Sequence, residues 1–270
     1  MKYLISYIFL LLTPILVVAE ENRNFIMLGK ARSDGEIVKA KGLFKSLMIG
    51  HQQAISHNRE ESFISHITAK IKNKIILDVS TSPSLGSNPK IKYKFKDIGH
   101  PKSIEYIITD NKSNTKELSF DIKRKCSIKS KKEKVEYLNN YQSVNFRKTN
   151  PKAWKARTYK EAVNELYGLI ESPIKNKINI ESPDSIVCPD FYVSISSNED
   201  LESIAIFVLE LSHPTIAVFS IPPNSIIDYQ IKTQVKYPKY SYIVIGKGRN
   251  GKFYKTMKTG KVERFSDACL

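Results

Sequence analysis

Apolar and polar residues alternate with a period of two over several short segments of the chain. The segment KIKYKFK is the clearest, because Ile91, Tyr93 and Phe95 fall on one side and four lysines fall on the other. Such alternation is typical of β-strands that are buried on one face. The segments EIVKAKGLFK and SHITAKIK repeat the pattern, and SIEYIITDNKSNTKELSFDIK predicts two strands joined by a polar turn. Residues 30–125 therefore predict a β-sandwich.

A polar, basic interval at residues 126–158 follows, and its charge is typical of a solvated linker. The next segment, TYKEAVNELYGLIE, places its apolar residues at helical spacing, and Thr158 with Glu161 has the pattern of a capping box. We expect a short amphipathic helix there.

After Pro173 the strand pattern returns in the segments FYVSIS, SIAIFVLEL, TIAVFSI, DYQIKTQVKY, YSYIVIGKG and KFYKTMKTGKVE. The pair Asn250-Gly251 between the last two segments is a strong hairpin signal. The sequence thus predicts a second β-sandwich within residues 159–270. The fold class that we expect is all-β, with two sandwich domains in tandem and a short helical segment before the second.

The first 19 residues have the composition of an export signal. Lys2 precedes the apolar run Leu4–Val18, and Val17 and Ala19 are small residues at the positions that a signal peptidase reads. The run is short for a membrane span. We expect cleavage after Ala19 and export to a bacterial periplasm, with an uncleaved N-terminal anchor as the alternative.

The formal net charge of +16 changes this picture only modestly. The lysines are spread over the chain instead of clustering with aromatic residues, which does not favour nucleic-acid binding. A positive field favours small anions and acidic partners. We expect no nucleic-acid partner and, after signal cleavage, no membrane contact.

Conventional catalytic signatures are missing from the sequence. The histidines have no metal-ligand spacing, and we interpret them as scattered surface residues. There is no phosphate-binding loop, nucleophile elbow or C-x-x-C pair, and we expect no catalytic residue, metal or cofactor. The five histidines are His51, His57, His66, His100 and His213.

The three cysteines are the remaining candidates for chemistry. In an oxidising compartment at least one of them stays unpaired in the monomer. A disulfide between Cys126 and Cys188 would close a loop of roughly 60 residues and stabilise the fold by ~4 kcal/mol, although the sequence does not show that the two meet. Cys269 lies on a tail, where a nucleophilic thiol can enter another protein's active site. A chance terminal cysteine and an intermolecular disulfide are the alternatives.

Five stretches carry a resemblance to known families. In the first half these are GEIVKAKGLFKSLMIGH, SFISHITAKIKNKIILDVSTSPSLGSNPKIKYKF and IEYIITDNKSNTKELSFDIK. On these residues the region 30–125 resembles SoxZ, the immunoglobulin-like subunit of the bacterial sulfur-oxidation carrier. In the second half, DLESIAIFVLELSHPTIAVFSI and YQIKTQVKYPKYSYIVIGKGRNGKFYKTMKTGKVE are similar to the partner subunit SoxY, which also ends in a cysteine. The individual SoxZ matches are Gly35, Glu36, His51, Ser87, Asn88, Pro89 and Asp110.

The resemblance implies a fused SoxYZ-type carrier with two immunoglobulin-like domains. Cys269 would carry the sulfur substrate covalently, and the carrier itself would catalyse nothing. Its partners would be the periplasmic Sox cytochrome, hydrolase and dehydrogenase components. The sequence departs from the family at the arm, because Ala268 and Leu270 stand where the family has glycines. The alternatives are a helper of a quinoprotein dehydrogenase and a secreted tandem β-sandwich interaction module.

Overall fold

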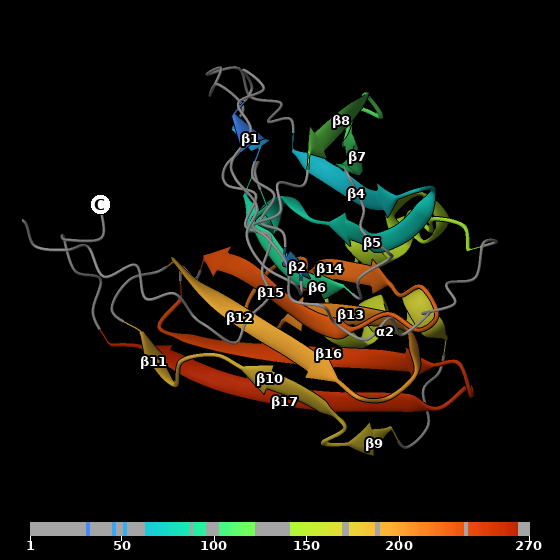
Figure 1. Cartoon of the computed structure of the whole chain (residues 1–270). Helices are drawn as coiled ribbons and strands as arrows, with labels where there is room; N and C mark the ends of the chain where they lie inside the picture. The colour runs from blue at the N-terminus through green and yellow to red at the C-terminus, as the bar shows by residue number, and fades with distance from the viewer. Residues whose placement is uncertain are drawn as a thin grey trace, which may run out of the picture.

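The computed structural model describes residues 31–32, 45–46, 51–52, 63–86, 89–95, 103–121, 141–168, 173–186, 190–234 and 237–263. Strands dominate these residues, and the all-β prediction is confirmed. Two sheets pack face to face, and the helical segments cover the outer face of the larger sheet (Figure 1). None of the described helices has the length and apolar character to cross a bilayer. The predicted signal peptide, residues 1–19, lies outside the described residues.

The larger sheet has ten strands among the described residues and runs through both halves of the chain. Its neighbours pair antiparallel, apart from two short strands that run parallel to β17. In order across the sheet these strands are β11 (Ser185–Ile186), β17 (Phe253–Val262), β16 (Lys239–Gly248), β13 (Leu201–Val208), β14 (Thr215–Ser220), β5 (Lys74–Thr81), β4 (Ile64–Ile71), β7 (Ser103–Asp110) and β8 (Thr115–Asp121), with β9 (Ile174–Lys175) also on β17.

The smaller sheet covers the inner face of the larger one. In order it contains β10 (Ile178–Glu181), β12 (Asp190–Ser197), β15 (Ile227–Gln234), β6 (Ile91–Phe95) and β2 (Lys45–Ser46). A separate parallel pair joins β1 (Ala31–Arg32) to β3 (His51–Gln52). The 3-10 helix η1 (Pro83–Leu85) follows β5.

The two halves of the chain are joined within both sheets. In the larger sheet β5 pairs with β14, with Thr81 opposite Ala217, and in the smaller sheet β6 pairs with β15, with Ile91 opposite Ile231. The strands that the sequence assigns to two sandwiches therefore share hydrogen-bonded ladders. This arrangement satisfies strand edges that two separate sandwiches would leave open.

Burial follows the predicted alternation in some strands and departs from it in others. In β6, Ile91, Tyr93 and Phe95 are buried and the lysines between them are half-buried, as the sequence predicts. In β4 both faces are buried, including His66 and Thr68 on the face that the pattern assigns to solvent. The reason is that residues 141–146 lie over this face and bond to it.

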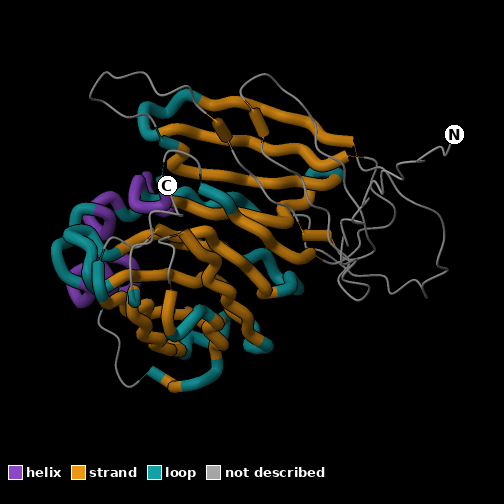
Figure 2. The backbone as a smooth tube through the Cα atoms, turned by 90° about the vertical axis from the view of Figure 1, so that its left-hand side faces the viewer, coloured by secondary structure: helices purple, strands orange, loops and turns teal. Residues whose placement is uncertain are grey.

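The helical layer begins inside the interval that the sequence predicts as a solvated linker. It comprises α1 (Phe146–Thr149), the 3-10 helix η2 (Pro151–Trp154) and α2 (Tyr159–Tyr167), which lie together on one side of the molecule (Figure 2). The capping box of Thr158 and Glu161 is confirmed, and Gly168 ends α2 with a positive φ of 75°. Trp154 and Leu166 pack on Phe207 and neighbouring side chains of the larger sheet. This buried apolar face is what folds the predicted linker onto the sheet.

Candidate functional site

The three cysteines that the sequence singles out, Cys126, Cys188 and Cys269, all lie outside the described residues. The structure does describe the strand from which the C-terminal residues continue. We call β17 from Lys258 to Val262, together with Glu263 and β11, the arm root. Of the described residues, this region includes those closest in sequence to the candidate attachment thiol of Cys269.

The arm root is fixed by backbone hydrogen bonds up to its last described residue. β16 pairs with β17 along its length, and β11 pairs with its end on the other side. The backbone N–H of Lys261 donates to Asp184 O at 3.0 Å, and that of Glu263 donates to Ile186 O at 3.0 Å. The described backbone is therefore held by hydrogen bonds as far as Glu263.

A buried tyrosine of β16 contacts both β17 and the residues just before β11. Tyr240 of β16 is 0% exposed, and its hydroxyl donates to Pro183 O at 2.5 Å, just before β11. Its ring passes so close to Gly260 that a Cβ there would lie 2.3 Å from the ring carbon Cζ. Burial, followed by the charge of Asp184, raises the pKa of Tyr240. Position 260 therefore requires glycine, because a side chain there would overlap the ring of Tyr240.

Charged side chains surround the root at the surface. Lys258 forms an ion pair with Asp184, and Lys261 forms one with Glu263 at 3.4 Å. The hydroxyl of Ser185 and the ammonium of Lys261 hold the pKa of Glu263 below its usual value. These pairs are exposed, so they orient the root without storing much free energy.

The strand register places Ile186 beside Val262 at the root. In the sequence, Cys188 follows Ile186 by two positions and Cys269 follows Val262 by seven. Both cysteines lie outside the described residues. Cys126 is not placed by the described residues, and a disulfide between Cys126 and Cys188 stays a prediction.

A second polar cluster lies on the face of β4 and β5 that residues 143–144 cover. We name His66, Thr68, Asp78, Ser80 and Ser143 the junction network. The interpretation of His66 as a surface residue is wrong, because the residue is 5% exposed. Its Nδ1 lies 3.1 Å from Ser80 Oγ, and its Nε2 lies 3.0 Å from Asp78 Oδ1 and 3.1 Å from Ser143 Oγ.

The junction network contains the residue types of a hydrolytic triad, and Ser80 and Asp78 lie on opposite ring nitrogens of His66, as in a triad. The hydroxyl of Ser80 also accepts a hydrogen bond from the backbone N–H of Phe146 at 2.9 Å. Ser80 is 0% exposed and Asp78 is 1% exposed, so a substrate has no access to this serine or this carboxylate. Asp78 also accepts bonds from Ser143 Oγ and Val144 N–H, both at 2.7 Å. The cluster therefore clamps residues 143–144 onto the sheet.

Sequence reasoning missed the junction network because its members are far apart along the chain. Ser143 lies in the interval predicted as a linker, and His66 lies on a strand face predicted to be solvated. The one local signal is that three of the four residues at 65–68 are polar in an otherwise largely apolar strand. These residues are Ser65, His66 and Thr68. A charged or polar residue on a buried face needs partners, and those partners are not visible in a local pattern.

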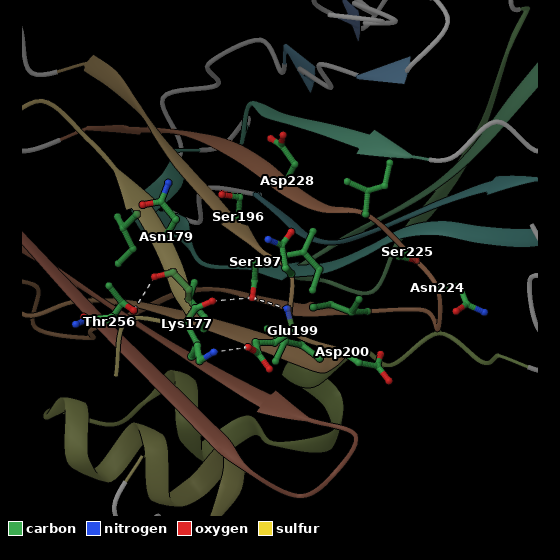
Figure 3. A pocket seen from close by; sticks show the side chains of 18 of the residues that line it. Lys177, Asn179, Ser196, Ser197, Glu199, Asp200, Asn224, Ser225, Asp228 and Thr256 are labelled. Atoms are coloured by element: carbon green, nitrogen blue, oxygen red, sulfur yellow. Dashed lines mark hydrogen bonds and ion pairs between the residues drawn. The ribbon is translucent and has the colours of Figure 1, made fainter. Parts of the chain in front are cut away.

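A shallow groove of about 900 Å³ lies between the β9–β10 turn, the β12–β13 turn and the loop before β15 (Figure 3). Its polar groups largely bond to each other: Lys177 pairs with Glu199 at 3.3 Å, Ser197 Oγ donates to Lys177 O, and Thr256 Oγ1 donates to Ile178 O. Charges of both signs line it and no acid–base pair stands out. Among the described residues, no group of three or more His, Cys, Asp or Glu side chains is arranged to hold a metal ion.

Parts of this chain are similar to several solved structures. Similar solved structures include the sulfur carrier protein SoxY from Chlorobium limicola f thiosulfatophilum, with 20% identity over 38% of this chain and 94% of that chain and a TM-score of 0.35. Superoxide reductase (neelaredoxin) from Ignicoccus hospitalis follows, with 19% identity over 33% and 81% of the two chains and a TM-score of 0.29. CopC from Methylosinus trichosporium OB3b has 9% identity over 32% and 89% and a TM-score of 0.27.

A search of curated proteins finds no match. Residues 26–121 match the family model described as sulphur oxidation protein SoxZ. This segment includes the strands β4 to β8 and the parallel pair β1–β3. The family match, and not the low structural scores, supports a relation of this chain to the Sox sulfur-carrier family.

Proposed function

We propose that the protein is a periplasmic carrier that holds thiosulfate-derived sulfur on Cys269 and presents it to Sox enzymes. The match of residues 26–121 to SoxZ carries this proposal. The geometry of the arm root supports it, because the backbone is fixed up to Glu263 and the thiol follows close behind in the sequence. From Arg264 to Cys269 the chain can extend ~20 Å, which is enough to reach a recessed active site.

The chemistry of loading is an oxidation at sulfur. The Cys269 thiolate and the terminal sulfur of thiosulfate form an S–S bond, and two electrons pass to the partner cytochrome. Hydrolysis then breaks the bond between this sulfur and the sulfonate. The oxygen of water joins the sulfonate to form sulfate, two protons are released and a persulfide stays on Cys269. A dehydrogenase component then accepts six electrons from the outer sulfur of the persulfide. Three water molecules supply the oxygens of the new sulfonate, and six protons are released. The carrier supplies the thiolate and its mobility and catalyses none of these steps.

Export by a signal peptide at residues 1–19 places this chemistry in the periplasm. An oxidising compartment makes the redox state of Cys269 decisive, because a disulfide would remove the nucleophile. Ile186, two positions before Cys188, pairs with Val262 at the arm root. Peptide mapping under non-reducing conditions tests this point, and a Cys269 disulfide in the active protein contradicts the carrier function.

The deciding experiment compares wild type with Cys269→Ser. Both proteins are incubated with thiosulfate and the thiosulfate-attaching cytochrome, and the intact masses are measured. We expect one thiosulfate-derived group on the wild type and none on the variant, with equal thermal stability, because a tail residue contributes little packing. Cys188→Ser is the matched control and should load normally. Equal loading of Cys269→Ser, or no loading of wild type, overturns the proposal.

A further inference from the structure

The helical layer carries a group of exposed cations that we name the basic cap. Two acidic residues, Glu161 and Glu165, lie in the same stretch of residues 146–168. The Glu161 carboxylate accepts hydrogen bonds from the backbone N–H groups of Arg157 and Thr158 at 3.0 and 3.1 Å, so it is committed to the start of α2. The members of the basic cap are Lys148, Lys152, Lys155, Arg157 and Lys160.

Five basic side chains elsewhere in the second half form ion pairs with carboxylates. Within the part of the chain that the structure describes, the five members of the basic cap form no ion pair, and they outnumber the two carboxylates of the same stretch. The cap therefore presents net positive charge to solvent. The balanced pairs are Lys177–Glu199, Lys247–Glu202, Arg249–Asp200, Lys258–Asp184 and Lys261–Glu263.

The backbone that displays the cap is held in place. Arg147 stacks its guanidinium between Phe63, at 5.0 Å from the ring centroid, and Trp154, at 4.7 Å. The indole N–H of Trp154 donates to Phe146 O at 3.1 Å, and Thr215 Oγ1 donates to Ala153 O at 2.9 Å. A preorganised surface loses less conformational freedom when a partner binds.

The cap continues along one face of β17 towards the arm root. Phe253 packs on Tyr167 of α2, and the ammonium of Lys255 lies 4.9 Å from the ring centroid of Tyr159. Alternate residues share a face of a strand, so Met257, which is 49% exposed, faces the same way. At ~3.3 Å per residue, Lys255 lies ~23 Å from Val262, which is close to the ~20 Å that the arm can extend.

We propose that the basic cap is the docking surface for an acidic face of a protein partner. The inference goes beyond the proposed function. It rests on that function in one respect, because the partners are taken to be proteins that exchange sulfur with Cys269. Docking on the cap leaves the arm within reach of a partner's active site. The net positive charge of the cap steers an acidic surface by long-range attraction, which raises the association rate and makes affinity depend on salt.

The test uses a fluorescently labelled oligoglutamate peptide as the acidic probe and the full chain as the receptor. The cap variant carries Lys152→Glu, Lys155→Glu and Lys160→Glu. The control variant carries Lys112→Glu, Lys116→Glu and Lys239→Glu, which are exposed lysines away from the helical layer. Both variants change the net charge equally, so a difference between them reports the position of the charge. Circular dichroism checks that each variant is folded.

At low ionic strength we expect wild type to bind the peptide, the cap variant to lose at least about tenfold in affinity and the control variant less than about threefold. Wild-type binding should weaken on adding salt to physiological strength. Equal losses in the two variants, no binding by wild type, or tighter binding to phosphatidylglycerol vesicles than to the peptide would overturn the proposal. Because none of these readouts involves Cys269, they are independent of whether the protein carries sulfur.

Discussion

The junction network and the arm root are both built from polar side chains, and they differ in what surrounds those side chains. In the junction network, Asp78 is 1% exposed and its carboxylate accepts hydrogen bonds from Thr68, Ser143 and Val144. At the arm root, the side chains of Lys261 and Glu263 are 64% and 52% exposed, and water competes for each contact. Similar hydrogen bonds and ion pairs therefore carry different weight in the two regions.

The difference indicates what a buried and an exposed polar cluster each contribute to the fold. A buried polar group must keep all of its partners, since an unpaired one costs a full desolvation penalty. Such a cluster fixes one geometry, as the junction network does for residues 143–144. Exposed pairs exchange freely with water and contribute little to stability.

The burial of tyrosine side chains should determine how the stability of the protein changes at high pH. Tyr93 and Tyr106 are buried, share a hydrogen bond at 2.9 Å, and have pKa values raised above the usual 10, mainly by burial. An unfolded chain loses these protons near pH 10 while the folded protein keeps them. Stability is therefore intact below pH 10 and falls above it, by about 1.4 kcal/mol per pH unit for each such tyrosine.

Absorbance of tyrosinate measured alongside circular dichroism checks this response. The buried tyrosines should ionise together with unfolding, in one cooperative step. The double variant Tyr93→Phe/Tyr106→Phe should unfold at a higher pH than wild type. Gradual ionisation of all tyrosines in the folded protein would contradict the assignment of burial as the cause.

Removing the carboxylate of the junction network should cost most among single substitutions. Asp78→Ala leaves Val144 N–H and the hydroxyl of Ser143 without their buried acceptor. We expect a loss of ~3 kcal/mol in the free energy of unfolding, measured by urea denaturation. The matched control is Asp110→Ala, whose carboxylate bonds to exposed turn residues, and its cost should be ~1 kcal/mol. Equal costs would remove the distinction between buried and exposed networks.

The close contact at the arm root should come next. Gly260→Ala places a methyl group against the buried ring of Tyr240, and we expect a loss of ~2 kcal/mol from overpacking. In the background Tyr240→Ala the same substitution should cost much less, because the ring is gone. Thermal unfolding of the four proteins gives the coupling, and additive effects would show that the contact carries no strain.

Periodicity predicted the strands and the helix, because these patterns depend on neighbours in the sequence. The burial of Ile91, Tyr93 and Phe95 and the capping box at Thr158 follow from local spacing. The shared sheets do not, because the pairing of Thr81 with Ala217 joins residues that are far apart in the chain. The burial of His66 depends on Ser143 in the same way. Cys269 stands out by position and chemistry alone, and its surroundings cannot be inferred from spacing.

The smallest effect should come from the charged pair at the arm root. The Ser185 hydroxyl and Lys261 lower the pKa of Glu263, so any stability from this carboxylate is present above its unfolded pKa and is lost as pH falls through the folded one. Because the group is exposed and water screens its contacts, Lys261→Gln and Glu263→Gln should each leave the free energy of unfolding close to that of wild type. If the pair only orients the root, loading of Cys269 with thiosulfate should stay within about twofold of wild type in both variants. A large loss of stability in either variant, measured by urea denaturation, would show that exposed and buried polar contacts weigh alike in this protein.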